Sequence, residues 1–396
     1  GDSGSRLSFI VLMFPLLPMH VCFALILSNA IAHESTYAGD RDVRYVNCLV
    51  PCLLECDNDR WRTALVKDSP SVLQALKTNS EGPGVYDLLP VGKKAYEDEL
   101  HAAYIVALRK SPDSGEAWYA APKVLQNWDL PLHLRILWWD CKEECRYSCM
   151  IQNREVRHKN GEQQVHYYGK WPLTRIAGMQ EFLSALFNIF LMVPYIWFLT
   201  VTSNIPAIVR TRGALLWRLQ LVMAIVLRCV DVLFRMRDNW VTELLDYHAT
   251  SLYFSSMLGN ALFHHMPDRW PVTRAVQVAF AGPAMLWIAI ILYLTLIKFD
   301  YGLFKTCSIC IAVGASVCWL VWAIRFRKEK AFGWKMVVAT WGSFLVLPIE
   351  LHDFPPIFFH LLDAHALCLL LIVPEQVLMC SFIRDDLKYN ADSKIC

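Results

Sequence analysis

Long apolar blocks constrain the fold of this chain more than any other feature. After position 180, apolar residues gather into seven blocks, at about 182–201, 214–234, 249–264, 275–297, 306–324, 334–350 and 357–380. A helix needs about 20 mostly apolar residues to cross the roughly 30 Å hydrocarbon core of a bilayer. The chain is also 55% hydrophobic and 19% charged, which is more apolar than soluble proteins. The pattern predicts an all-α membrane protein with a seven-transmembrane helical bundle.

The start of the chain has the features of a secretory signal. Residues 1–33 contain one basic residue in "RLSFIVLMF", an apolar core, and an Ala-x-Ala ending at Ala30 and Ala32. This pattern is typical of a cleaved signal peptide, and an uncleaved signal anchor is the alternative. In both cases the following residues are expected in the secretory lumen.

Two cysteine clusters lie in the polar region that precedes the apolar blocks. Both clusters, "CLVPCLLEC" and "CKEECRYSC", have cysteines spaced by four, namely Cys48, Cys52, Cys56, Cys141, Cys145 and Cys149. That spacing places three sulfur atoms on one face of a helix. Two such faces could join through three disulfides, as expected in an oxidising compartment. Zinc binding is the alternative, but structural zinc sites favour shorter gaps and often include His.

The predicted domain order follows from these segments. We expect a signal peptide (1–33), a lumenal Cys-rich domain (34–180) with an insertion at about 57–138, a seven-helix transmembrane domain (181–383) and a cytosolic tail (384–396). With the cysteines in the lumen, the predicted cytosolic loops hold eight Lys or Arg and the lumenal loops four. This bias agrees with the positive-inside rule. The net charge of +2 gives no support for nucleic-acid binding.

Ionisable residues interrupt the apolar blocks toward one predicted side of the membrane. In "IVLRCVDVLFRMRD" (225–238), Arg228, Asp231 and Arg235 are spaced by three and four, so they share one helix face. Further groups on the predicted lumenal side are Asp246, His248, His352, Asp353, Asp363 and His365. Ionisable groups within spans are costly and usually face a bundle interior or a cavity. The pattern predicts a site near the lumenal leaflet.

Several motifs resemble a known family. The segments "YYGKWPLTRIAGMQE" (167–181), "RMRDNWVTELLDYHAT" (235–250), "IKFDYG" (297–302) and "HDFPPIFFHLLDAHA" (352–366) resemble the post-GPI-attachment to proteins factor three, or Per-like, family. This family is part of the CREST superfamily of seven-span membrane hydrolases. The cysteine clusters match in order and spacing, and the resemblance covers about residues 40–56 and 139–390.

The resemblance implies a function in GPI-anchor lipid remodelling. The family removes the sn-2 acyl chain as a phospholipase A2-like hydrolase, so GPI lipid or GPI-anchored proteins are the implied partners. The implied location is the membrane of the Golgi apparatus or endoplasmic reticulum. The family's site implies a zinc ion that activates water, held by His residues in the second and seventh spans, with a Ser in the second span and an Asp at the third.

Some of the implied site residues are present and others are replaced. The expected Asp is Asp246, and the first His of the seventh span is His365, which is the metal ligand if a site is retained. The expected Ser falls on Asp231, the expected second-span His on Arg235, and the last His on Leu369. Neither guanidinium nor leucine offers a lone pair to a metal. Asp246, His365, Asp231 and Arg235 are therefore the candidate catalytic residues.

Two interpretations of the replaced residues follow. We hypothesise that Arg235, together with Arg228, supplies the positive charge that a metal would bring. The competing interpretation is a rebuilt metal site in which His248, His352 and His360 replace the lost imidazoles and Asp231 is an oxygen ligand. The functional alternatives are a hydrolase, a catalytically degenerate family member that binds GPI lipid or GPI-anchored proteins, and a receptor or channel.

Overall fold

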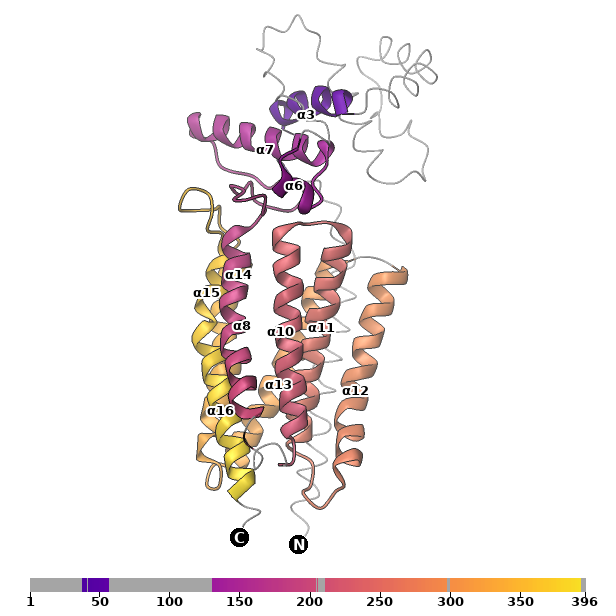
Figure 1. The fold of residues 1–396 in the computed structure, drawn as a ribbon, viewed down its shortest axis with the longest axis vertical. Coiled ribbons are helices and arrows are strands. Elements are labelled where there is room, and N and C mark those ends of the chain that lie inside the picture. Colours follow the sequence, from indigo (N-terminus) through magenta and orange to yellow (C-terminus); the bar gives the residue numbers. More distant parts are fainter. Residues whose placement is uncertain are drawn as a thin grey trace, which may run out of the picture. The chain divides into compact units, whose positions relative to one another are not determined.

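The computed structural model describes residues 38–40, 42–56, 130–203, 205, 211–297 and 300–392. The predicted signal peptide and most of the predicted insertion, residues 57–129, lie outside the described residues. Within these ranges the regular secondary structure is helical, apart from isolated bridges such as the one between Tyr167 and Lys170 (Figure 1). The predicted all-α fold class is confirmed.

The described residues form two compact units. The disulfide unit consists of the described residues of Ser35–Gly178 together with Pro355–His360. The helix unit contains the described residues of Met179–Phe354 and Leu361–Cys396. Each unit has its own buried core.

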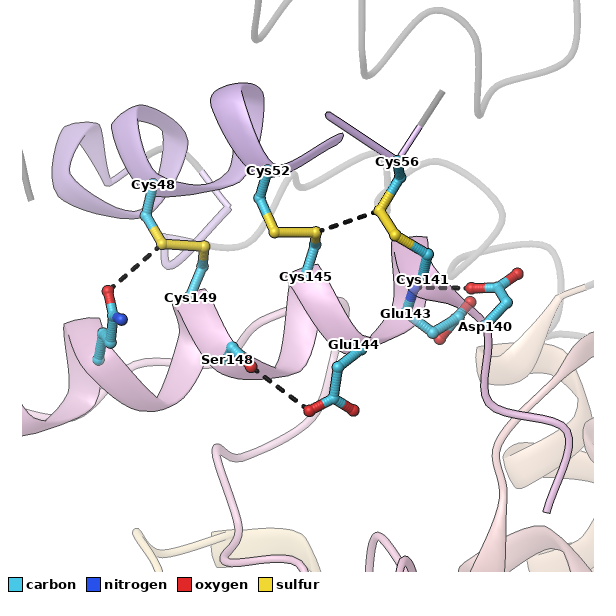
Figure 2. Close-up of a disulfide and its surroundings, with 11 residues drawn as sticks. Cys48, Cys52, Cys56, Asp140, Cys141, Glu143, Glu144, Cys145, Ser148 and Cys149 are labelled. Atoms are coloured by element: carbon cyan, nitrogen blue, oxygen red, sulfur yellow. Dashed lines mark hydrogen bonds between the residues drawn. A yellow bond between two sulfur atoms is a disulfide. The ribbon is translucent and has the colours of Figure 1, made fainter. Parts of the chain in front are cut away.

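Three disulfides join the first helix of the disulfide unit to its longest helix. The unit contains α3 (Val43–Cys56), α6 (Leu132–Ile136) and α7 (Cys141–Lys159). Helices α3 and α7 are antiparallel, and the bonds Cys48–Cys149, Cys52–Cys145 and Cys56–Cys141 follow one another along their facing sides (Figure 2). The predicted disulfides and the single-face placement of each cluster are confirmed.

Asp42, at the start of α3, connects this helix to the end of α7. Its carboxylate accepts hydrogen bonds from the backbone N–H and guanidinium of Arg44 and from Nη1 of Arg157, at 2.7–3.1 Å. Arg44 also donates to both carboxylate oxygens of Glu162, at 2.8 and 2.7 Å. Burial would raise the pKa of Asp42, but the hydrogen bonds, led by those from Arg44, outweigh burial and lower the pKa from 3.8 to about 2.

We expect the attachment of α3 to weaken in acid. Because the pKa of Asp42 is lower in the folded state, its stabilisation is complete above about pH 4 and is lost as the pH falls through about 2. Asp42→Asn should cost about 1–2 kcal/mol at pH 7, allowing for solvent screening of the partly exposed partners. Proteolysis of α3 in purified protein under mild denaturant measures this cost. The difference between wild type and variant should vanish near pH 2, and a constant difference would contradict the assignment.

The helix unit follows the order of the apolar blocks. Its elements are α8 (Phe182–Ser203), α10 (Ala214–Met236), α11 (Trp240–Phe263), α12 (Val272–Leu292) continued by η3 (Tyr293–Ile297), α13 (Tyr301–Arg325), η4 (Ala331–Gly333), α14 (Trp334–His352), α15 (Ala364–Leu371) and α16 (Val373–Asp392). The long helices lie side by side in Figure 1. Among the described residues, five segments are long and apolar enough to cross a membrane: Phe182–Thr202, Val272–Ile297, Tyr301–Arg325, Ala331–His352 and Ala364–Asp392.

Helices α10 and α11 are as long as the five candidate spans but more polar. They have 23 and 24 residues. Helix α10 carries Arg228, Asp231 and Arg235, and α11 carries Glu243 and Asp246 together with several Ser residues. The seven-span count stays a prediction, while the helical membrane fold does not depend on it.

The predicted seventh block begins later than expected. Residues 357–363 are not helical, because Phe358, Phe359 and His360 have positive φ angles of 47–60°, which a right-handed helix excludes. They follow Pro355 and Pro356, which restrict the preceding backbone. At its other end the helix continues to Asp392, through part of the predicted tail.

Asp386 anchors this continuing helix within the core of the helix unit. Its carboxylate is fully buried and accepts hydrogen bonds from Lys330 Nζ at 2.9 Å and Trp217 Nε1 at 3.2 Å, and it lies 3.4 Å from His264 Nε2. The rings of Trp217, Trp319, Trp322 and Phe382 pack against one another, and Trp217 links them to Asp386. This contact joins α16 to α10, α11 and the residues that precede α14.

Candidate functional site

Charged residues gather where five helices of the helix unit begin or end. Glu181 directly precedes α8, and Arg235 lies in the last turn of α10. Asp246 lies in the second turn of α11, Glu350 in the last turn of α14, and His365 in the first turn of α15. Helix α10 packs against α8 and α11, and α15 packs against α8 and α14. We call this group, together with Arg228 and Asp231, the charge cluster.

Arg235 is the centre of the charge cluster. Its Nε donates to Asp231 Oδ1 at 3.0 Å, and its Nη1 donates to Glu181 Oε2 at 2.8 Å. Asp231 and Glu181 are both buried. The guanidinium therefore neutralises two carboxylates that would be costly to bury alone.

Arg228 completes the arrangement on the same face of α10. Its Nη1 lies 3.7 Å from Asp231 Oδ2 and donates to Asn188 Oδ1 of α8 at 3.0 Å. Asp231 thus lies between two guanidinium groups, as the spacing of three and four residues predicts. Asn188 is fully buried, so it holds Arg228 in the interior of the bundle.

His365 is paired with a carboxylate on the neighbouring helix. Its Nδ1 lies 3.1 and 3.2 Å from the two carboxylate oxygens of Glu350. Because a carboxylate only accepts hydrogen bonds, Nδ1 carries the proton. His365 Nε2 has no hydrogen-bond partner among the described residues, and neither does Oδ1 of the buried Asp246. Both residues interact electrostatically with Asp231 and Arg235.

The structure thus brings together the four candidate catalytic residues from the sequence, Asp231, Arg235, Asp246 and His365. The three His residues of the rebuilt-site interpretation are not part of any metal-binding group among the described residues. His248 Nε2 lies 3.2 Å from Thr295 Oγ1 of η3, and His352 is exposed at the end of α14. His360 belongs to the disulfide unit, where its Nδ1 lies 3.2 Å from Gln164 Nε2.

The residues of the charge cluster do not fit the zinc ion that the family resemblance implies. Arg235 directly contacts Asp231, and its permanent positive charge would repel a metal. Leu369 offers no ligand atom. Within the described ranges, a single group of three His, Cys, Asp or Glu ligand atoms lies close together, and it consists of Cys56, Cys141 and Cys145. All three form disulfides (Figure 2).

Sequence reasoning missed Glu181, Asn188 and Glu350. Glu350 is the last residue of a predicted apolar block, where an acidic side chain is a signal in itself. Asn188 is a polar residue inside the first block. Glu181 precedes that block in a polar segment, so its sequence context gave no indication of burial.

The fold and the charge cluster define a class of protein: a helical membrane protein with a disulfide-bonded unit and buried charged groups at the ends of its helices. The model of the Per1-like family matches residues 131–387, which includes every residue of the charge cluster. The chain belongs to the Per1-like family.

Curated relatives carry names that refer to GPI. The chain is 30% identical over 274 residues to "GPI-specific phospholipase A2-like PGAP3" of Xenopus tropicalis, covering 66% of this chain and 83% of the relative. It is 28% identical to the Homo sapiens protein of the same name, with 65% and 80% covered. It is also 28% identical to "Post-GPI attachment to proteins factor 3" of Drosophila melanogaster, with 66% and 79% covered. No solved structure matches the chain.

Proposed function

We propose that this protein remodels the lipid of GPI-anchored proteins by hydrolysing the sn-2 ester. The observation that carries the proposal is the position of the charge cluster inside the region shared with the Per1-like family. The relatives' printed names, which contain "GPI-specific phospholipase A2-like", support this reaction and this substrate class.

The charge cluster has groups suited to ester hydrolysis. His365, oriented by Glu350, can accept a proton, which is the role of a general base. Arg235 and Arg228 provide fixed positive charge where negative charge develops on an attacked carbonyl. A membrane-embedded site would reach an ester bond close to the lipid headgroup.

The proposed orientation places the disulfide unit in the lumen of the Golgi apparatus or endoplasmic reticulum. Three disulfides support an oxidising compartment, and the distribution of Lys and Arg supports the same orientation. With this topology, the charge cluster lies near the lumenal leaflet, where GPI anchors are exposed. GPI-anchored proteins or free GPI lipid are the proposed partners.

Lipid analysis in cells tests the proposal. A GPI-anchored reporter is isolated from cells that lack their own remodelling activity, with or without this protein, and its phosphatidylinositol is analysed by mass spectrometry. We expect loss of the original sn-2 chain with wild type and its retention with Asp246→Asn. The matched control is Glu375→Gln, since Glu375 accepts a hydrogen bond from Ser343 outside the charge cluster. Unchanged lipid with correctly located wild-type protein would contradict the proposed hydrolysis.

The alternative function is binding of GPI lipid without hydrolysis. Two observations favour this alternative. Three site residues that the family resemblance implies are replaced, by Asp231, Arg235 and Leu369, and the guanidinium of Arg235 is held by two carboxylates. The same assay separates the two functions. A binding protein would co-purify with the reporter and leave its acyl chains unchanged.

A further inference from the structure

Two buried polar atoms of the charge cluster have no hydrogen-bond partner within the described part of the chain, which indicates that a small molecule binds there. Asp246 is 8% exposed, and its Oδ1 makes no hydrogen bond within the described part of the chain. His365 Nε2, on another helix, also has no partner there. A buried polar group without a hydrogen bond costs about 1–3 kcal/mol, so such groups require an explanation. The two residues also interact electrostatically with each other.

The chemistry of these two atoms selects the molecule that can bind. When His365 is neutral, its proton lies on Nδ1, where Glu350 accepts it, and Nε2 presents a lone pair. Asp246 Oδ1 is a carboxylate oxygen and also accepts. A partner for both atoms must donate two hydrogen bonds, and water is the smallest molecule that does so. A water held by both hydrogens has its oxygen lone pairs free for attack.

Arginine side chains supply the positive charge of the charge cluster. Arg235 contacts Asp231 and Glu181, and Arg228 contacts Asp231 and Asn188. Their charge is permanent and independent of metal supply. The carboxylates of Asp231 and Glu181 are therefore neutralised by the chain itself.

We propose that Asp246 and His365 bind the attacking water, and that His365, positioned by Glu350, activates it without a metal ion. This inference rests on the proposed hydrolysis. The water oxygen bonds to the acyl carbonyl carbon while a water proton moves to His365 Nε2. The bond between that carbon and the glycerol oxygen then breaks, and the glycerol oxygen takes the proton from Nε2. A fatty acid and a lysolipid leave, and His365 is restored. The side chain of His365 as a whole is 23% exposed, while its Nε2 atom is buried.

The test uses the purified full-length protein and phosphatidylinositol with an isotopically labelled sn-2 chain. Release of labelled fatty acid should be unaffected by 1,10-phenanthroline and EDTA, and the protein should contain no stoichiometric zinc. Glu350→Gln should lower kcat by about 10²-fold with KM unchanged, since the general base loses its orientation. Glu350→Asp, which keeps a carboxylate, should have a kcat between those of wild type and Glu350→Gln. The matched control Glu375→Gln should behave as wild type.

The outcomes separate this inference from the proposed function. Hydrolysis that chelators abolish and zinc restores, with one zinc per chain, would leave the function standing and overturn the metal-free site. Equal loss of kcat in Glu350→Gln and Glu375→Gln would overturn the role of Glu350. Wild-type protein that releases no fatty acid would overturn the proposed hydrolysis and the activation of water with it.

Discussion

Replacing Arg235 with leucine is expected to destabilise the helix unit by about 3–5 kcal/mol, because removal of one partner leaves buried charges without compensation. Asp231 and Glu181 are both buried and both accept hydrogen bonds from Arg235. Arg235→Lys should destabilise the helix unit less than Arg235→Leu, because lysine keeps the positive charge. Some cost should remain, because an ammonium group lacks the planar fork with which the guanidinium reaches both carboxylates. The midpoint of thermal unfolding of the purified protein, followed in detergent, measures the change.

The control for Arg235 is an arginine in an exposed ion pair. Arg384 donates to Asp385 at 3.2 Å, and half of its side chain is exposed. Exposed pairs contribute about 0–1 kcal/mol, so Arg384→Leu should leave the unfolding midpoint nearly unchanged. A similar shift for both leucine variants would show that Arg235 has no special structural role. If adding Asp231→Asn to Arg235→Leu partly restores the unfolding midpoint, the uncompensated carboxylate of Asp231 is the cause of the destabilisation.

Removing the central disulfide is the second change with a large expected effect. Cys52→Ser together with Cys145→Ser should cost the disulfide unit about 2–5 kcal/mol. The bonds Cys48–Cys149 and Cys56–Cys141 remain in this variant, so the cost comes from the α3–α7 core. That core consists of the half-cystines Cys48, Cys52, Cys145 and Cys149 with Tyr45, Leu49, Leu53 and Tyr167. Such a small core has little other apolar burial to hold it together.

Protease resistance of the α3–α7 segment, compared between oxidised wild type and the double variant, measures this effect. The control is Cys229→Ser, which removes a free cysteine of α10 and should leave resistance unchanged. Removal of all six cysteines should abolish the folded disulfide unit. A double variant as resistant as wild type would show that helix packing alone holds α3 on α7.

The sequence predicts most of the fold because its signals are local. Apolar blocks define the long helices, and the spacing of four between cysteines predicts two facing helix sides that the structure joins by disulfides. The predicted start of the seventh apolar helix was wrong, because local hydrophobicity and backbone geometry disagree there. Residues 357–363 are apolar, yet three consecutive left-handed residues after two prolines interrupt the helix there.

The candidate site was only partly predictable, because its contacts join distant positions. The alignment of Arg228, Asp231 and Arg235 on one face follows from the helix repeat. The pairing of Glu350 with His365 joins two helices across the loop that separates them, and Glu181 meets Arg235 across 54 residues. No spacing rule relates such pairs, since they depend on which helix ends meet in the folded bundle.

The central claim is that an arginine with its two carboxylates occupies the place where the family resemblance implies a metal. An experimental density map of the purified protein, at a resolution that shows side chains, tests this claim most directly. We predict that the guanidinium of Arg235 lies between Asp231 and Glu181, with His365 on Glu350 and a water beside Asp246. Density for a metal ion coordinated by His365 and Asp246, with Arg235 turned away from Asp231, would contradict the account.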